Sequence, residues 1–164
     1  MKRAWVWGIV ISLWLVYMIV AFIWMGERHL RWFDPQYKLA GQSAALQGYI
    51  ANLPGNSVIE FVEPGCYCNP FSSDHRETLR SDFRHQGKVV QVIKPGDAER
   101  AWLPSTPAVL VLGENKQIVY LGPYSAGLYC SANNSFVVAA VNNYQRANLT
   151  TGILDDAKGC YCHL

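Results

Sequence analysis

Two cysteines separated by a single residue, Cys66 and Cys68, lie where the pattern predicts the end of a buried strand and the start of a helix. The positive end of a helix dipole favours a thiolate over a thiol. The thiolate is the form of cysteine that attacks disulfides and binds metal ions. We therefore expect redox or metal chemistry in the turn formed by residues 60–70.

The tetrapeptide Gly-Cys-Tyr-Cys occurs twice, at residues 65–68 and again at residues 159–162. A disulfide between Cys66 and Cys68 would close a small ring, so its geometry would be strained and its reduction easier. A couple of this kind would be relatively oxidising or isomerase-like. If strain prevents the bond, another thiol must resolve Cys66.

Three cysteines outside the turn are candidates for that relay or resolving role. Cys160 and Cys162 in the C-terminal tail come first, and Cys130 is a further candidate, with a buried inert thiol as its alternative. A purely structural alternative is that the tail pair bridges Cys66 and Cys68 and ties the tail down. The sequence leaves these possibilities open.

An apolar stretch near the N-terminus, residues 4–25, carries no charged side chain. At about 1.5 Å per residue, a helix of this length spans the hydrocarbon core of a bilayer, which is about 30 Å thick. No Ala-x-Ala cleavage pattern follows it, and tryptophans stand near both ends, as in the aromatic belts of membrane proteins. The stretch predicts an uncleaved single-pass anchor in contact with the lipid bilayer.

The charges around this stretch favour a cytoplasmic N-terminus. Lys2 and Arg3 precede the stretch, and a long following domain translocates largely regardless of its charge. All five cysteines follow it, which is compatible with an oxidising compartment. We expect a protein of the inner (cytoplasmic) membrane with its C-terminal domain in the periplasm. Lys2 and Arg3 account for the formal net charge of +2, so the outer domain is neutral and nothing indicates binding to nucleic acid.

The elements expected beyond the anchor alternate in a regular order. A β-α-β unit followed by a β-β-α unit predicts an α/β fold with a four-stranded mixed sheet and helices on both faces. An additional helix with Asp34 as its N-cap precedes this domain. In the expected helix at 71–86, the side chains of Arg76, Arg80 and Arg84 are interpreted as a solvated face. The expected elements are a helix at 37–53, strands at 57–62, 89–93, 108–112 and 117–121, and helices at 71–86, 95–102 and 131–148. The expected domains are a cytoplasmic tail 1–3, the anchor 4–25, a juxtamembrane segment with the additional helix 26–54, the α/β domain 55–149 and a cysteine-containing tail 150–164.

Several positions in residues 57–148 together resemble the thioredoxin family. Phe61 precedes Cys66 by the family's spacing between strand and nucleophile, and Glu60 falls where thioredoxins keep a buried acid. Thr106 and Pro107, followed by an apolar strand, are similar to the family's cis-proline loop. The resemblance implies a thioredoxin-like fold, and the anchor makes the chain similar to membrane-anchored bacterial thiol-disulfide oxidoreductases.

The resemblance also implies roles for individual residues. It assigns Cys66 as the nucleophile, Cys68 as its resolving partner, and Glu60 as a proton-transfer group with a raised pKa. It assigns Thr106 and Pro107 to substrate binding. The expected substrates are thiols or disulfides of extracytoplasmic proteins. The resemblance further implies a membrane or periplasmic redox partner and no cofactor. The spacing departs from the family's Cys-x-x-Cys, because Asn69 stands where the second cysteine would be. Glu60 as an exposed residue of an edge strand, and Pro107 with a trans bond, are the alternatives.

Two other classes of function compete with a redox role. Thiolates of Cys66, Cys68, Cys160 and Cys162, with His163, would suit copper(I) or zinc. A membrane-anchored thioredoxin-like domain with cysteines and a histidine also resembles the copper-delivery proteins of respiratory-oxidase assembly, whose cysteines are more widely spaced. The third class is a non-catalytic thioredoxin-like interaction module, because a fold does not determine a function.

Overall fold

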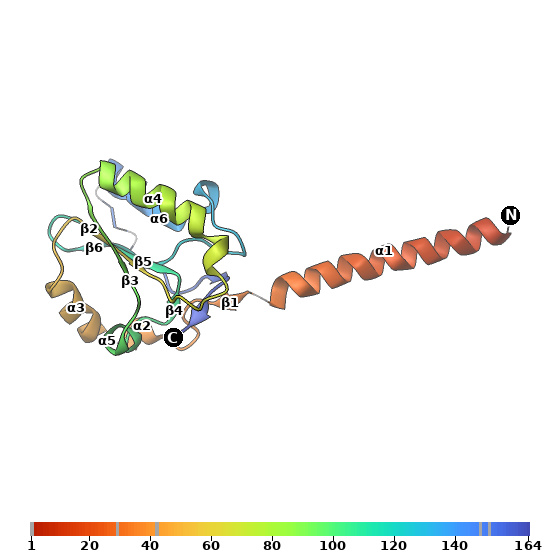
Figure 1. The fold of residues 1–164 in the computed structure, drawn as a ribbon, viewed down its shortest axis with the longest axis horizontal. Helices are drawn as coiled ribbons and strands as arrows, with labels where there is room; N and C mark the ends of the chain where they lie inside the picture. Colours follow the sequence, from red (N-terminus) through yellow and green to blue (C-terminus); the bar gives the residue numbers. More distant parts are fainter. Residues whose placement is uncertain (1, 29, 42, 148, 151) are drawn as a thin grey trace.

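The chain forms a mixed α/β domain preceded by one long helix (Figure 1). The computed structural model describes residues 2–28, 30–41, 43–147, 149–150 and 152–164. The helices, in chain order, are α1 (Lys2–Arg28), α2 (Lys38–Gly41), α3 (Ser43–Ala51), η1 (Asn69–Phe71), α4 (Ser73–His85), α5 (Asp97–Arg100), η2 (Ala132–Asn134) and α6 (Phe136–Ala147). The strands are β1 (Arg31–Trp32), β2 (Ser57–Phe61), β3 (Val89–Ile93), β4 (Ser105–Thr106), β5 (Ala108–Leu112), β6 (Ile118–Pro123), β7 (Gly152–Ile153), β8 (Lys158–Gly159) and β9 (Cys162–His163).

The N-terminal helix α1 extends away from the rest of the chain (Figure 1). Its segment Trp5–Gly26 has a mean hydropathy of 2.5, and none of its residues is buried in the domain. The helix is long and apolar enough to cross a membrane, as predicted. Length and composition alone would equally fit a signal sequence.

The central sheet has five strands in the order β3-β2-β5-β6-β7. β2 and β3 run parallel because helix α4 carries the chain back across the sheet, whereas β5 and β6 form an antiparallel hairpin. All four predicted strands are therefore present. The prediction of a four-stranded sheet is wrong by one strand, because β7 from the C-terminal segment pairs in parallel with β6 at the edge.

Helices cover both faces of the sheet, with α4 and α6 on one face and α3 and α5 on the other (Figure 1). Successive side chains of a strand point to opposite faces. Ile59 and Phe61 of β2 accordingly pack with Leu46 and Ile50 on the α3 side. Val58 joins the cluster formed by α4 and α6. Glu60 has the same parity as Val58, so its carboxylate lies on the α4 side.

The additional helix starts later than predicted. Tyr37 has a positive φ of 54°, so the helical conformation begins only at Lys38. Asp34 still supports the helix start, because its carboxylate accepts hydrogen bonds from the backbone N–H groups of Lys38 and Leu39, both at 2.9 Å. Two helices, α2 and α3, occupy the predicted range; Gln42, and Asn148 at the predicted end of the last helix, lie outside the described residues.

The C-terminal segment, predicted as a polar tail, is part of the folded domain. Its three short strands pair with distant parts of the chain: β7 with β6, β8 with β1, and β9 with β4. Ala157, Cys160 and Tyr161 are buried. Since β1 follows α1 closely, the segment lies between the end of the apolar helix and the cysteine turn.

Candidate functional site

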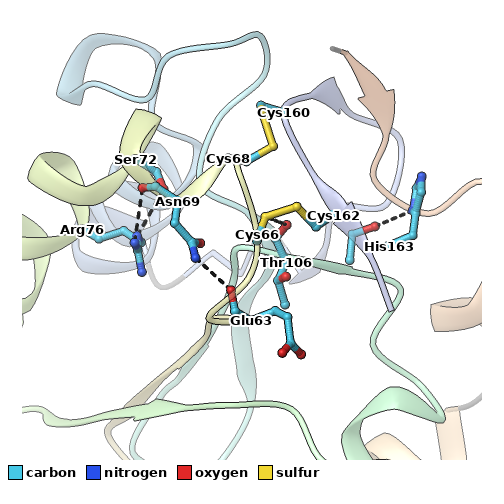
Figure 2. The surroundings of a disulfide bond; sticks show 11 residues. Glu63, Cys66, Cys68, Asn69, Ser72, Arg76, Thr106, Cys160, Cys162 and His163 are labelled. Atoms are coloured by element: carbon cyan, nitrogen blue, oxygen red, sulfur yellow. Dashed lines mark hydrogen bonds between the residues drawn. A yellow bond between two sulfur atoms is a disulfide. The ribbon is translucent and has the colours of Figure 1, made fainter. Parts of the chain in front are cut away.

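Two disulfides connect the cysteine turn to the C-terminal segment (Figure 2). Cys66 is bonded to Cys162 and Cys68 to Cys160, with Cα–Cα distances of 5.8 Å and 5.5 Å. Both distances fall in the usual range for disulfides. The two cysteines of the turn are not bonded to each other, so the expected Cys66–Cys68 couple is not the pairing found here. The partners are Cys162 and Cys160, the tail cysteines that were predicted as resolving candidates and, in the structural alternative, as the pair that bridges Cys66 and Cys68.

Hydrogen bonds of the backbone and of Asn69 hold the turn in shape. The backbone N–H of Cys66 donates to the carbonyl oxygen of Glu63 at 3.0 Å, and that of Asn69 donates to Cys66 at 3.2 Å. The Asn69 side chain also donates to the Glu63 carbonyl at 2.8 Å (Figure 2). Asn69 thus fastens the turn at the position where the Cys-x-x-Cys pattern would place the second cysteine, a role that sequence reasoning missed.

The segment carrying Cys162 lies as a strand beside Thr106. β9 pairs antiparallel with β4, with Cys162 opposite Thr106, and the N–H of Leu164 extends the ladder to the carbonyl of Pro104 at 3.0 Å. The sulfur of Cys66 lies 3.7 Å from the Thr106 carbonyl oxygen, and the Thr106–Pro107 peptide bond is cis. The position predicted for a substrate is therefore occupied by the chain's own C-terminal strand.

The two Gly-Cys-Tyr-Cys copies play different structural parts. Tyr161 is 3% exposed, packs edge-on against Phe33 at 5.3 Å and donates a hydrogen bond to the Ser125 carbonyl at 2.6 Å. Gly159 is required there, because a Cβ atom would lie 2.5 Å from the Tyr161 hydroxyl. Tyr67 of the first copy is 49% exposed. The second copy anchors the C-terminal segment, whereas the first forms the turn.

The sulfur atoms form a compact cluster. The Sγ atoms of Cys66, Cys68 and Cys162 all lie within 4.8 Å of one another. Cys66, Cys68 and Cys160 are buried, and Cys162 is partly exposed. Such a set could exchange disulfides or, once reduced, hold a thiophilic metal ion.

Glu60 is buried in the middle of the sheet, on β2 between β3 and β5. The alternative of an exposed residue on an edge strand is therefore wrong. Both carboxylate oxygens accept from Nε of Arg80, at 3.1 and 3.2 Å. Burial raises the pKa of the Glu60 carboxyl, and the charges of Arg80 and Arg76 offset part of this rise.

The interpretation of the three helix arginines as a solvated face is wrong for two of them. Arg76 is buried and Arg80 pairs with Glu60, whereas Arg84 is exposed.

Tyr124 interacts electrostatically with Glu60 and lies beside the cysteine site. Burial, and then the charge of Glu60, raise the pKa of the Tyr124 phenol well above its usual value. Tyr124 also lines a cavity of about 20 Å³ together with Cys68, Cys160 and Pro107. A cavity of this size holds about one water molecule. The hydrogen bonds of the Glu60 carboxylate go to Arg80, and Tyr124 lines the cavity, whereas Glu60 itself does not.

Cys130, the fifth cysteine, is a free thiol that lines the same cavity. Burial raises the pKa of the Cys130 thiol, which disfavours the reactive thiolate. The hydrogen bond from Ser125 and the charge of Arg76 offset this only in part. Cys130 is thus near the bridges but outside the bonded set.

His163 faces away from the two disulfides (Figure 2). Its Nδ1 lies 2.9 Å from the Ser105 hydroxyl, which itself donates to the Phe33 carbonyl at 2.6 Å. Because the hydroxyl proton is used in that bond, Nδ1 of His163 must be the donor to Ser105. Burial, and then the charges of Arg31 and Lys38, lower the pKa of His163. His163 positions the C-terminal strand rather than joining the sulfur cluster.

Comparison with known proteins places the chain in a family. Residues 35–164 match the family model described as "Domain of unknown function (DUF6436)". The chain belongs to the DUF6436 family. The match begins after the apolar helix and includes every cysteine discussed above. No curated protein and no solved structure matches the chain.

Proposed function

We propose that this DUF6436 chain is a membrane-anchored, thioredoxin-like thiol-disulfide oxidoreductase whose reactive couple is Cys66–Cys162. One observation carries the proposal. A strand bearing Cys162 lies antiparallel on Ser105–Thr106 and is disulfide-bonded to Cys66. This is the arrangement that a covalent intermediate with an extended polypeptide substrate would need, since strand addition positions a peptide through its backbone.

The catalytic cycle uses the cluster as follows. The thiolate of reduced Cys66 attacks a substrate disulfide and forms a mixed disulfide, and one substrate sulfur leaves. Cys162 then attacks Cys66, which restores the Cys66–Cys162 bond and releases the second substrate sulfur as a thiol. Glu60 exchanges protons with the site through Tyr124 and the adjoining cavity. Substrates are disulfides in extracytoplasmic proteins, and an isomerase reaction would use the same mixed disulfide.

Three further features support the thioredoxin-like assignment. The strand order joins a β-α-β unit to a β-β-α unit. A cis-proline follows β4 beside the sulfur of Cys66. A buried acid, Glu60, lies on the strand that leads to the cysteine turn.

Replacement of the proposed nucleophile tests the catalytic role. We expect Cys66→Ser to lower the turnover of a protein disulfide such as that of insulin to the uncatalysed rate, because serine cannot form the mixed disulfide. Turnover is measured with a dithiol reductant and the full chain in detergent. Cys130→Ser, which removes the free thiol, is the matched control and should retain wild-type turnover. Unchanged turnover in Cys66→Ser would rule out the assigned role.

A metal-binding role is the second candidate, and the proximity of three sulfurs favours it. Thiolates of Cys66, Cys68 and Cys162 within 4.8 Å could hold zinc or copper(I) after reduction, with Cys160 as a fourth ligand. Reduced wild-type protein would then retain about one zinc ion per chain through gel filtration. If the cluster does not bind zinc, the metal content of the wild type should equal that of a variant with serine at all four bridged positions.

We further infer that α1 remains attached as a transmembrane anchor in the inner membrane and that the domain faces the periplasm. The intact chain should stay in the membrane pellet after alkaline carbonate extraction and dissolve in detergent, because the described residues of the domain leave its apolar helix uncovered. Peptide mapping should recover the segment Trp5–Gly26 in the mature protein. A soluble form that begins after Gly26 would instead identify α1 as a cleaved signal sequence.

A further inference from the structure

The four bridged cysteines differ in their access to solvent. Cys66, Cys68 and Cys160 are 6%, 1% and 6% exposed, whereas Cys162 on the outer strand β9 is partly exposed. A thiolate must contact a sulfur atom to exchange with it. Cys162 is therefore the bridged cysteine that a thiolate from another molecule can attack.

The group released by this attack lies next to the second bridge. When Cys162 is attacked, Cys66 departs as a thiolate. Its sulfur lies within 4.8 Å of the sulfur of Cys68, close to the contact that disulfide exchange requires. Cys160 is not in this group of mutually close sulfurs. The sulfur of Cys68 is thus the atom of the buried bridge that the Cys66 thiolate attacks.

We propose that reducing equivalents arrive at Cys162 and that the Cys66 thiolate then opens the buried Cys68–Cys160 disulfide. This inference rests on the proposed function, because it requires a dithiol reductant as a partner. It adds the order in which the two bridges react. It also makes Cys162, and not Cys66, the residue that meets this reductant.

The exchange balances in three steps. A thiolate of the dithiol bonds to Cys162, and the electron pair of the Cys66–Cys162 bond goes to Cys66. Cys66 then bonds to Cys68, and Cys160 leaves as a thiolate that takes a proton from water. The second thiolate of the reductant attacks its own mixed disulfide and releases Cys162, which also takes a proton. The reductant leaves as a disulfide, and the chain holds a Cys66–Cys68 bond and two thiols in its C-terminal segment.

After a single two-electron reduction, no disulfide attaches the C-terminal segment to the cysteine turn. Non-covalent contacts then hold it: the β6–β7, β1–β8 and β4–β9 pairings and the packing of Tyr161. The two thiols of Cys160 and Cys162 are carried on this segment.

The double variant Cys66→Ser/Cys162→Ser tests the relay directly. It keeps the Cys68–Cys160 bridge but removes both sulfurs that would transmit the exchange. With dithiothreitol as the reductant and N-ethylmaleimide as the trap, we expect this bridge to open at least about tenfold more slowly than in the wild-type full chain, because direct attack must reach buried sulfurs. The matched variant Cys68→Ser/Cys160→Ser should open Cys66–Cys162 within about twofold of the wild-type rate. Equal rates of Cys68–Cys160 opening in the first variant and the wild type would overturn the proposal.

A measurement on the wild-type chain covers the case in which the variant unfolds. After one equivalent of dithiothreitol, mass mapping should find a Cys66–Cys68 disulfide with alkylated Cys160 and Cys162. Alkylated Cys68 and Cys160 beside an intact Cys66–Cys162 bond overturns the relay, and so does a closed Cys68–Cys160 bridge beside alkylated Cys66 and Cys162. A closed Cys68–Cys160 bridge beside alkylated Cys66 and Cys162 would still agree with the proposed function, because the Cys66–Cys162 bond would have been reduced.

Discussion

Serine at all four bridged positions should lower the free energy of unfolding by about 7 kcal/mol in the loop-entropy model of disulfide stabilisation. The bridges join residues 96 and 92 positions apart. Closing one loop of that length contributes about 4.7 kcal/mol. The second bridge then closes a ring of only about six residues, which adds about 2 kcal/mol. The total rivals the whole stability of many domains.

The same reasoning makes the two bridges strongly non-additive. Removal of either pair alone should cost only about 2 kcal/mol, because the remaining bridge keeps the long loop closed. Urea unfolding of the full chain in detergent, with each double-serine variant and the four-serine variant, measures the three costs. Cys130→Ser is the control and should change stability by less than about 1 kcal/mol. Equal costs for each pair that sum to the four-serine value would contradict this arrangement.

Arg80→Met should destabilise the domain by about 3 kcal/mol at neutral pH, because it leaves the buried carboxylate of Glu60 without its hydrogen-bonded partner. The value lies at the low end for a broken buried pair, since Arg76 still faces Glu60. Adding Glu60→Gln to Arg80→Met should recover most of the loss. Arg84→Met, on an exposed position of the same helix, is the matched control and should cost less than about 0.5 kcal/mol.

The penalty of Arg80→Met should also depend on pH in a defined direction. The pKa of Glu60 is raised in the folded domain, so the folded state binds more protons than the unfolded state above the ordinary glutamate pKa of about 4.3. Stability therefore falls as pH rises from there through the folded pKa. Loss of Arg80 raises the folded pKa further and extends this window upward. The difference between Arg80→Met and wild type should be small near pH 4 and greatest at high pH, and a difference that does not change with pH would contradict the role of Glu60.

Stability and exchange are compatible in this arrangement. Because either bridge keeps the long loop closed, opening one of them costs the fold little. A domain with a single bridge could not reduce it without losing most of the stabilisation that the cross-link contributes. The Cys68–Cys160 bridge thus keeps the C-terminal segment in place while the Cys66–Cys162 bridge is open. Once the exchange has produced a Cys66–Cys68 bond, the strand pairings hold the segment.

The strands of the central sheet and the helices that cover it could be predicted from local patterns. The β-branched run at β3 and the buried run at β5 are strong signals, and both strands were expected within a residue of their observed bounds. The C-terminal strands could not be predicted in this way. β7, β8 and β9 are two residues long, so they show no periodicity, and each depends on a partner far away in the chain.

The cysteines of the candidate site were recognisable, but their connectivity was not. Four cysteines allow three pairings, and spacing does not choose among them. The choice follows from the β4–β9 register, which places Cys162 opposite Thr106 and beside Cys66. The partner of Glu60 was missed for a similar reason, because Arg80 lies on a helix whose charged stripe looked uniformly solvated. Only the packing of α4 on the sheet shows that this side chain turns inward.

The redox state of the Cys66–Cys162 pair across a series of glutathione buffers tests the central claim most directly. Trapping with N-ethylmaleimide and mass mapping of the full chain would measure the reduced fraction of this pair at each ratio of thiol to disulfide. A reactive couple should pass reversibly from oxidised to reduced, with the same midpoint whether the chain starts oxidised or reduced. A Cys66–Cys162 bond that stays closed at every ratio until the domain is unfolded would show a structural cross-link and contradict the proposed function.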